Sequence, residues 1–334
     1  MPASSSSLSP LIATISRAAV PPERLSAAQS IRLLQALSAV PDPRQRRGRR
    51  HSLQSILLIA ISAVLAGARS YAAIGDWAVL ARPAVGVRGR PPSGATIRRV
   101  LMAVDPVAVE AALTRCTLAC RNAAAATTEQ KSLPHNERRQ VLAIDGKSLR
   151  GARQPDRQQT KLVSVIDHAH RLVLTQTEVC DGNEIAAFRT ALDSLPQLRG
   201  CLITADALHT QRGHADYLLA RGAHYLFTVK ENQPTLHRAL AALPWRAAPK
   251  EQDPGSRRRH GRVEFRTATV IDLEGTEVGT LFPGTARAMK IVRRRTDTAT
   301  GVASTETFLY LHMVKQLYDW GAHAAVASAA GAAR

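Results

Sequence analysis

Two short apolar segments, each followed directly by an aspartate, constrain this chain more than any other feature. Gln140–Ile144 runs into Asp145, and Cys201–Ala205 runs into Asp206. A strand that is buried on both faces of a sheet has this nearly continuous apolar character, so both segments are predicted to be central strands that end at their aspartates. Strands also end at aspartates simply because a loop begins there, so the pattern by itself leaves a structural and a functional interpretation open.

The segments around these aspartates alternate between strand and helix patterns. Three of them have further strand patterns, at 162–167, 172–178 and 224–229. Two have amphipathic helix patterns, at 184–195 and 211–221. The resulting order, β-β-β-α-β-α-β, predicts a mixed α/β sheet, with His168–Arg171 as a hairpin turn. Additional strand-like stretches lie at 263–273 and 288–293.

The first 125 residues have a different pattern, in which apolar residues recur at helical spacing. This pattern predicts an all-helical N-terminal domain, with helices at 23–39, 53–66, 71–80, 95–103 and 107–122. Ser93 is the expected N-cap of the fourth helix. A polar linker, 126–139, is expected before the α/β domain of 140–310, and an Ala-rich tail, 311–334, after it.

The chain is strongly basic, with 45 Lys and Arg residues against 26 Asp and Glu residues and a net charge of +19. Such a charge favours a polyanionic partner, most simply nucleic acid, although a GC-rich genome also enriches arginine. Five arginines lie within Arg44–Arg50, and we take Arg46, Arg47, Arg49 and Arg50 as candidate phosphate contacts. A solvated linker is the alternative interpretation of this segment.

Other sequence features exclude several classes of protein. The four cysteines have no zinc-site spacing and suggest no disulfide framework. The longest apolar run, 56–66, is shorter than the ~20 residues that span a bilayer. We therefore expect a soluble, cytoplasmic protein.

The two aspartates together suggest a metal site. Ligand sites in open α/β sheets lie outside the carboxyl ends of the strands, where Asp145 and Asp206 are expected to meet. Two adjacent carboxylates repel each other unless a cation lies between them, and hard oxygen ligands suit Mg²⁺ or Mn²⁺. Such ions support phosphodiester cleavage and strand transfer. The small residues Gly146 and Ala205 would let a phosphate backbone approach.

Several segments, in order and at fitting spacing, resemble the DDE transposases of H-repeat-associated, ISAs-type insertion sequences. Two of them are similar to the first- and second-aspartate motifs of that family: Ala143–Gly151 and Thr204–Gln211. The others are similar to the strand that follows, to a His-Gly-Arg-x-Glu segment and to the N-terminal domain: Tyr225–Gln233, His260–Arg266 and residues 42–66. The similarity runs from about residue 35 to about residue 310.

The resemblance implies a ribonuclease-H-like catalytic core with a β-rich insertion at about 245–300, preceded by the helical domain. It implies an insertion-sequence transposase in which Asp145 and Asp206 bind the metal. Four more residues are candidate DNA contacts: Lys147, Lys230, His260 and Arg262. The expected partners are the terminal inverted repeats and target DNA, bound by a homo-oligomer in the bacterial nucleoid.

The family's third carboxylate is a glutamate in a His-Trp-x-Ile-Glu-Asn helix, and this sequence contains no such motif. We expect a frameshift or premature end near residue 310, which would remove one metal ligand and leave a poor catalyst. Glu231 follows its strand too soon to replace it. Two alternatives stay open: a catalytically dead DNA-binding remnant, and a ribonuclease-H-like nuclease that does not transpose.

Overall fold

The computed structural model describes residues 27–47, 49–81, 89–127, 140–153, 159–252, 257–259 and 261–313. The chain divides into two compact units. Besides the N-terminal helices, the first unit contains residues 146–166 and 170–187, whereas residues 167–169 and 188–313 belong to the second. The boundary falls inside strand β1, Val141–Arg153, which therefore contributes to both units.

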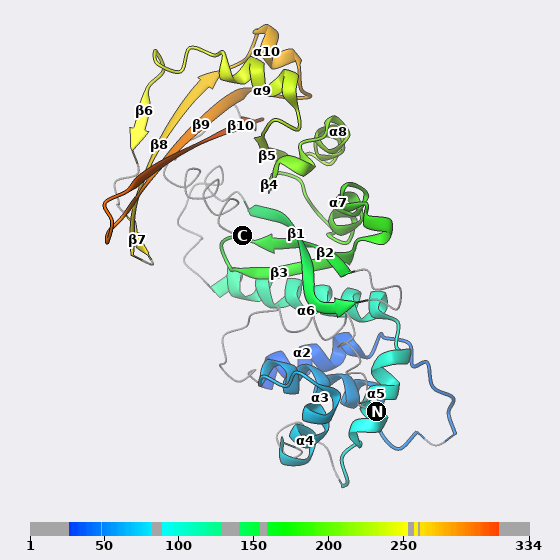
Figure 1. Cartoon of the computed structure of the whole chain (residues 1–334). Coiled ribbons are helices and arrows are strands. Elements are labelled where there is room, and N and C mark those ends of the chain that lie inside the picture. Colours follow the sequence, from blue (N-terminus) through cyan, green and yellow to red (C-terminus); the bar gives the residue numbers. More distant parts are fainter. Residues whose placement is uncertain are drawn as a thin grey trace. The chain divides into compact units, whose positions relative to one another are not determined.

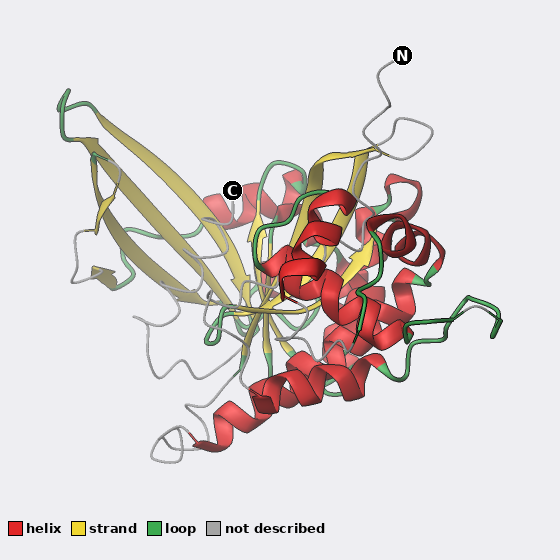
Figure 2. Cartoon of the chain, turned by 90° about the horizontal axis from the view of Figure 1, so that it is seen from below, coloured by secondary structure: helices red, strands yellow, loops and turns green. Residues whose placement is uncertain are grey.

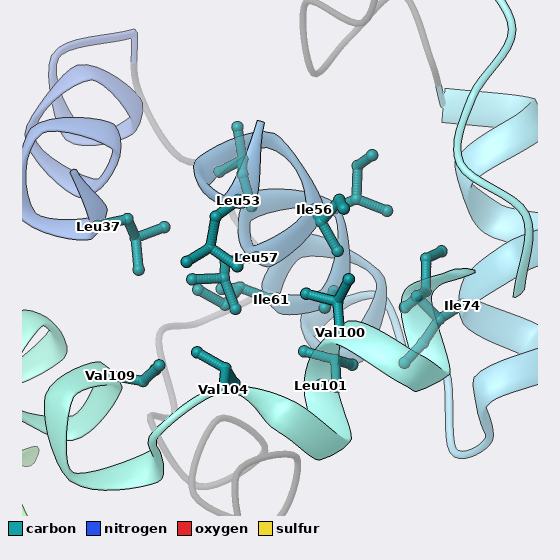
Figure 3. Close-up of a cluster of buried hydrophobic side chains, with 14 of the residues drawn as sticks. Leu37, Leu53, Ile56, Leu57, Ile61, Ile74, Val100, Leu101, Val104 and Val109 are labelled. Atoms are coloured by element: carbon teal, nitrogen blue, oxygen red, sulfur yellow. The ribbon is translucent and has the colours of Figure 1, made fainter. Parts of the chain in front are cut away.

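The first unit begins with helices packed around a shared apolar core. Their bounds are α2 Ala27–Leu37, α3 Leu53–Leu65, α4 Tyr71–Ala81, α5 Gly94–Ala103 and α6 Pro106–Thr127. Helix α3 has nine buried residues and lies among the others, and Figure 3 shows its side chains meeting those of α2, α4, α5 and α6. Burial on nearly all sides explains why α3 is apolar around its whole circumference.

Serine caps and close glycine contacts fix the geometry of these helices. The side chains of Ser52 and Ser93 accept hydrogen bonds from backbone N–H groups in the first turns of α3 and α5, as predicted for Ser93. Helices α4 and α5 approach so closely that a Cβ on Gly75 would lie 2.9 Å from the Cα of Gly94. Glycine at both positions permits this packing.

Three strands and part of a helix complete the first unit. Strand β2, Gln159–Asp167, lies between β1 and β3, Leu172–Glu178, and a turn at 168–171 joins β2 to β3. Helix α6 packs against β3, where the Glu110 carboxylate accepts a 2.7 Å hydrogen bond from the Gln176 backbone N–H. After the short helix η3, Cys180–Gly182, helix α7 covers Glu184–Asp193 and starts in this unit.

The second unit is built on a mixed sheet with the strand order β1-β4-β5-β10-β9-β8-β6, and β7 also pairs with β8. Strands β1, β4 and β5 are parallel, whereas β10 is antiparallel to both β5 and β9. The strands are β4 Leu202–Ala205, β5 His224–Val229, β6 Lys250–Gln252, β7 Arg257–Arg259, β8 Arg262–Asp272, β9 Arg287–Asp297 and β10 Ala303–His312. The helices are η4 Ala207–His209, α8 Arg212–Ala220, α9 Pro234–Ala241 and α10 Glu277–Thr280. The predicted mixed α/β fold is thus confirmed (Figure 1).

Each face of this sheet has its own core. On one face Phe188 of α7 and His214 of α8 stack at 3.9 Å between ring centroids, and Phe188 meets Phe227 of β5 edge to face. On the other face a cluster joins β4, β5, β8, β9 and β10 through Leu202, Leu226, Ala268, Met289, Ile291 and Tyr310. Strands β4 and β5 are therefore buried on both faces, which accounts for their nearly continuous apolar sequences.

Strands β8, β9 and β10 continue into a long twisted ribbon (Figures 1 and 2). On one face of the ribbon Glu264 pairs with Arg266 and Arg295, and Glu306 pairs with Arg293. The Glu264–Arg295 and Glu306–Arg293 pairs thus join neighbouring strands of the ribbon, whereas the Glu264–Arg266 pair lies within β8. Strand β10 was not among the predicted strands, because its first half is polar.

The structure corrects two predicted boundaries, the end of the first strand and the start of the tail. Strand β1 does not end at Asp145 but continues to Arg153, because its second half pairs with β2 beyond the reach of the short strand β4. Strand β10 includes Leu311 and His312, which were assigned to the tail, while residues 314–334 lie outside the described part. Among the described residues, no helix is long and apolar enough to cross a membrane.

Candidate active site

Asp145 and Asp206 emerge side by side from two parallel strands. Ala143 pairs with Thr204 and Ile144 with Ala205, so the next residue on each strand is an aspartate. Alternation along a strand places Asp145 on the face of Ala143 and Asp206 on the face of Thr204, which is one and the same face of the sheet. Adjacent strands lie roughly 4.8 Å apart, so the two half-buried carboxylates converge on one small region.

Asp206 begins a tight turn that fixes its carboxylate. Its Oδ1 accepts a 3.0 Å hydrogen bond from the Leu208 backbone N–H, so the residue caps the short helix η4. At the end of the turn Thr210 Oγ1 donates to the Thr228 carbonyl oxygen of β5 at 2.6 Å. The turn is therefore fastened to the neighbouring strand.

His209 lies behind this turn and belongs to the core. It is fully buried and its ring lies 5.3 Å from that of Phe188. Burial lowers the pKa of His209 to about 4, although the Asp206 carboxylate acts in the opposite direction. The neutral imidazole is thus part of the core beneath the turn.

Asp145 has a different setting, within a continuous strand. The following residue, Gly146, is small and was expected to let a phosphate backbone approach. In the structure the Glu184 carboxylate lies where a Cβ of Gly146 would be. Any larger residue at this position would displace the Glu184 carboxylate, so glycine leaves space for an internal contact.

The donor set fits a hard divalent cation. Two carboxylates on one face supply oxygen ligands of the kind that Mg²⁺ and Mn²⁺ prefer, and two protein carboxylates leave room for water and phosphate oxygens. Within the described residues, however, no cluster of three or more His, Cys, Asp or Glu side chains could hold a metal ion. The described residues thus provide two carboxylates for such a site.

The other predicted site residues lie at different distances from the aspartates. Lys147 is exposed on β1, two residues beyond Asp145. Lys230 is exposed just past the end of β5, at the same edge of the sheet as Asp206. Arg262 is exposed near the tip of the ribbon, seven residues along β8 from Thr269, and thus roughly 23 Å beyond the end of β5. His260 lies outside the described residues.

The arginine segment forms the exposed loop between α2 and α3. Arg46, Arg47 and Arg50 are exposed there, whereas Arg49 pairs with Asp42 at 3.3 Å. Arg44 also pairs with Asp42, and its hydrogen bond is the main reason that the pKa of Asp42 is lowered to about 2. Asp42 thus organises the loop and partly neutralises Arg49.

Comparison with known proteins identifies the family. The Transposase DDE domain family matches residues 136–280, and the DDE_Tnp_1-associated family matches residues 34–116. The "Putative transposase YncI" of Escherichia coli K12 is 30% identical over 215 residues, which cover 62% of this chain and 81% of YncI. The "H repeat-associated putative transposase YhhI" of the same organism is 28% identical over 253 residues, covering 72% of this chain and 63% of YhhI.

The chain belongs to the DDE transposases, a family of DNA-processing enzymes. It spans less than two thirds of YhhI. Among solved structures, the cryo-EM structure of the piggyBac transposase synaptic complex with hairpin DNA has a TM-score of 0.38 and 12% identity, covering 89% of this chain and 63% of that one. That likeness is too remote to inform the site.

Two residues that contact the neighbours of the aspartates could not be predicted from the sequence. Glu184 was assigned only to an amphipathic helix, and Thr210 only to a family motif. No local pattern marks either residue, because their partners lie 38 residues away at Gly146 and 18 residues away at Thr228.

Proposed function

We propose that this chain is an insertion-sequence transposase in which Asp145 and Asp206 hold a divalent cation, Mg²⁺ or Mn²⁺. One observation carries the proposal: two carboxylates in a DDE transposase domain leave neighbouring parallel strands on the same face. The proposed fold is a ribonuclease-H-like core that begins at about 140 and includes β10 to His312, with its insertion at about 245–300. A linker would join it to the helical domain, whose helix α6 extends to Thr127 and not only to the predicted 125.

The proposed reaction needs no covalent bond between protein and DNA. Water attacks the phosphodiester at the element end and breaks its bond to the 3′-oxygen, which leaves as a 3′-hydroxyl. This hydroxyl then attacks a phosphodiester of target DNA, and the target strand's own 3′-oxygen leaves as the new bond forms. A divalent ion, when bound, would stabilise charge on the attacking and leaving oxygens. Asp145 and Asp206 would hold it, and the exposed Lys147 and Lys230 would contact the phosphates on either side.

The proposed partner is DNA, both terminal inverted repeats and target, bound by at least two copies of the chain because two ends must meet. Arg46, Arg47, Arg49 and Arg50 would bind phosphates from the helical domain, and Arg262 with His260 from the ribbon. Each phosphate neutralised releases counterions, so binding should weaken steeply as salt rises. The expected location is the bacterial cytoplasm, at the nucleoid.

A nicking assay tests the proposal. The full chain is incubated with supercoiled plasmid carrying element ends, with Mg²⁺, with Mn²⁺ or with chelator. Metal-dependent nicks at the ends and joined products are expected. Nicks without preference for the ends, and no joining, would instead indicate the ribonuclease-H-like nuclease.

A second candidate function is DNA binding without cleavage, as in a catalytically dead remnant. Two observations favour it: no third carboxylate joins the site within the described residues, and the sequence contains no His-Trp-x-Ile-Glu-Asn motif. Salt-sensitive binding to element ends without nicking in either metal would support it. Appending a family tail that carries the motif should then restore nicking.

A further inference from the structure

A loop next to the Asp206 turn holds that turn through two side-chain amides. Asn232 and Gln233 lie between β5 and α9, in the second unit with Asp206. Asn232 Nδ2 donates to the Ala207 carbonyl oxygen at 2.7 Å, and Gln233 Nε2 donates to the Thr210 carbonyl oxygen at 2.9 Å. The two bonds therefore reach both ends of the turn.

The turn depends on outside partners because it is very short. Helix η4 has three residues, and one turn of 3₁₀ helix leaves most of its carbonyl groups without a partner inside the helix. The Ala207 carbonyl, which accepts a 3.3 Å bond from the Thr210 N–H inside the turn, gains a second donor from the loop after β5, and the Thr210 carbonyl also accepts from that loop. The Leu208 N–H that this turn presents is the donor to Asp206 Oδ1, so the amides act on the carboxylate through the backbone.

Gln233 occupies a position where a different bond is expected. It is the N-cap residue of α9, yet its side chain makes no hydrogen bond to the first turn of that helix. The amide is instead directed to Thr210. Two preceding residues are exposed: Lys230, a predicted DNA contact, and Glu231, which follows its strand too soon to be the third carboxylate.

We propose that Asn232 and Gln233 are positioning residues that hold the Asp206 carboxylate in register with Asp145 for cation binding. This inference rests on the proposed function, because it assumes that Asp206 is a ligand. Residues that orient a ligand from behind typically change metal affinity by about 10- to 100-fold. The lower end is expected here, because each amide acts through the backbone of the turn.

The experiment uses Asn232→Leu and Gln233→Met in the full chain, which remove the donors while keeping size and adding no charge. Gln159→Met is the matched control, because Gln159 Nε2 also donates to a backbone carbonyl, that of Leu149, at 3.1 Å. Mn²⁺ affinity is measured by electron paramagnetic resonance, and exchange of the backbone amides of 206–211 by hydrogen–deuterium exchange. Asp206→Asn defines the Asp206-dependent binding.

Faster exchange at 206–211 together with an approximately tenfold loss of Mn²⁺ affinity in both variants, but not in the control, is the expected result. Unchanged exchange, or faster exchange with wild-type Mn²⁺ affinity, would overturn the positioning role while leaving the metal site intact. If the wild-type chain itself shows no Asp206-dependent Mn²⁺ binding, the proposed metal site fails, and the positioning role fails with it.

Discussion

The segments that present Asp145 and Asp206 differ in how they are held. Asp145 lies inside a strand of 13 residues, whereas Asp206 follows a strand of four residues and starts a turn. Backbone pairing thus fixes the first carboxylate, and side-chain hydrogen bonds fix the second. We call the surroundings of Asp145 the β1 side of the proposed site and the surroundings of Asp206 its β4 side. The β1 side depends on backbone pairing and close packing, whereas the β4 side depends on individual polar side chains.

The largest expected effect is a loss of DNA nicking, and it should be similar for the two aspartates. Asp145→Asn and Asp206→Asn should each reduce DNA nicking by at least about 10³-fold, because each removes a negatively charged ligand from the cation. Asp193→Asn is the control, since Asp193 is an exposed carboxylate bonded to Tyr217 and Arg221. Initial nicking rates at saturating metal give the comparison. A large loss in only one of the two variants would contradict a shared site.

The next effect concerns Glu110 of helix α6, which accepts a hydrogen bond from β3, the edge strand beside β2. Burial raises the pKa of Glu110 to about 7, against hydrogen bonds from Gln176 and Thr114 that lower it. The folded state therefore holds a proton more tightly than the unfolded state, and stability should fall as pH rises from about 4.5 to about 7. The change is on the order of 3 kcal/mol. Urea unfolding across this pH range should show the slope in the wild type and a reduced slope in Glu110→Gln; equal slopes would contradict the prediction.

A smaller effect tests close packing on the β1 side. Gly146→Ala should destabilise the protein by about 1 kcal/mol, the low end for an inserted methyl group, because the Glu184 carboxylate that it displaces is the end of a flexible side chain. Gly213→Ala is the control: it lies in helix α8, meets only the end of the Arg189 side chain, and should be neutral or stabilising. Denaturant unfolding distinguishes the two. Equal stabilities would show that Glu184 moves aside without cost.

The smallest effect tests the side-chain bonds of the β4 side. Thr210→Val should cost about 1 kcal/mol, because it removes the bond to the buried Thr228 carbonyl. Thr175→Val is the matched control, since Thr175 is buried and its hydroxyl has no hydrogen-bond partner among the described residues. That control should be neutral or stabilising. If both variants unfold at the same denaturant concentration, the bond contributes nothing.

The sequence predicted the strands best where burial on both faces makes them continuously apolar. The range 224–229 matches β5, and Asp206 directly follows β4 as predicted. The range 172–178 also matches β3, although the second half of this edge strand is polar. The length of β1 could not be predicted, because its polar second half resembles a loop. Strand β10 was missed for a related reason, since charge pairing rather than apolar burial holds its first half.

The proposed site was predictable only as far as its two acids. Aspartates after apolar strands are visible in the sequence, but the residues that we propose to orient them are not. Asn232 and Gln233 follow a recognisable strand, yet their partners are backbone carbonyls 25 and 23 residues away, which no spacing rule identifies. For Arg49 the sequence suggested too much. Its place in an arginine-rich segment predicts a DNA contact, whereas the ion pair with Asp42 neutralises part of its charge.

The most direct test of the two-aspartate metal site is a metal-specificity switch at Asp206. Asp206→Cys replaces a hard carboxylate with a softer thiolate, which binds Mg²⁺ poorly. With unchanged thermal unfolding, the variant should lose nicking in Mg²⁺ and regain part of it in Mn²⁺, while the wild type nicks in both. Wild-type rates for the variant in Mg²⁺, no recovery in Mn²⁺, or no metal-dependent nicking by the wild type would contradict the account.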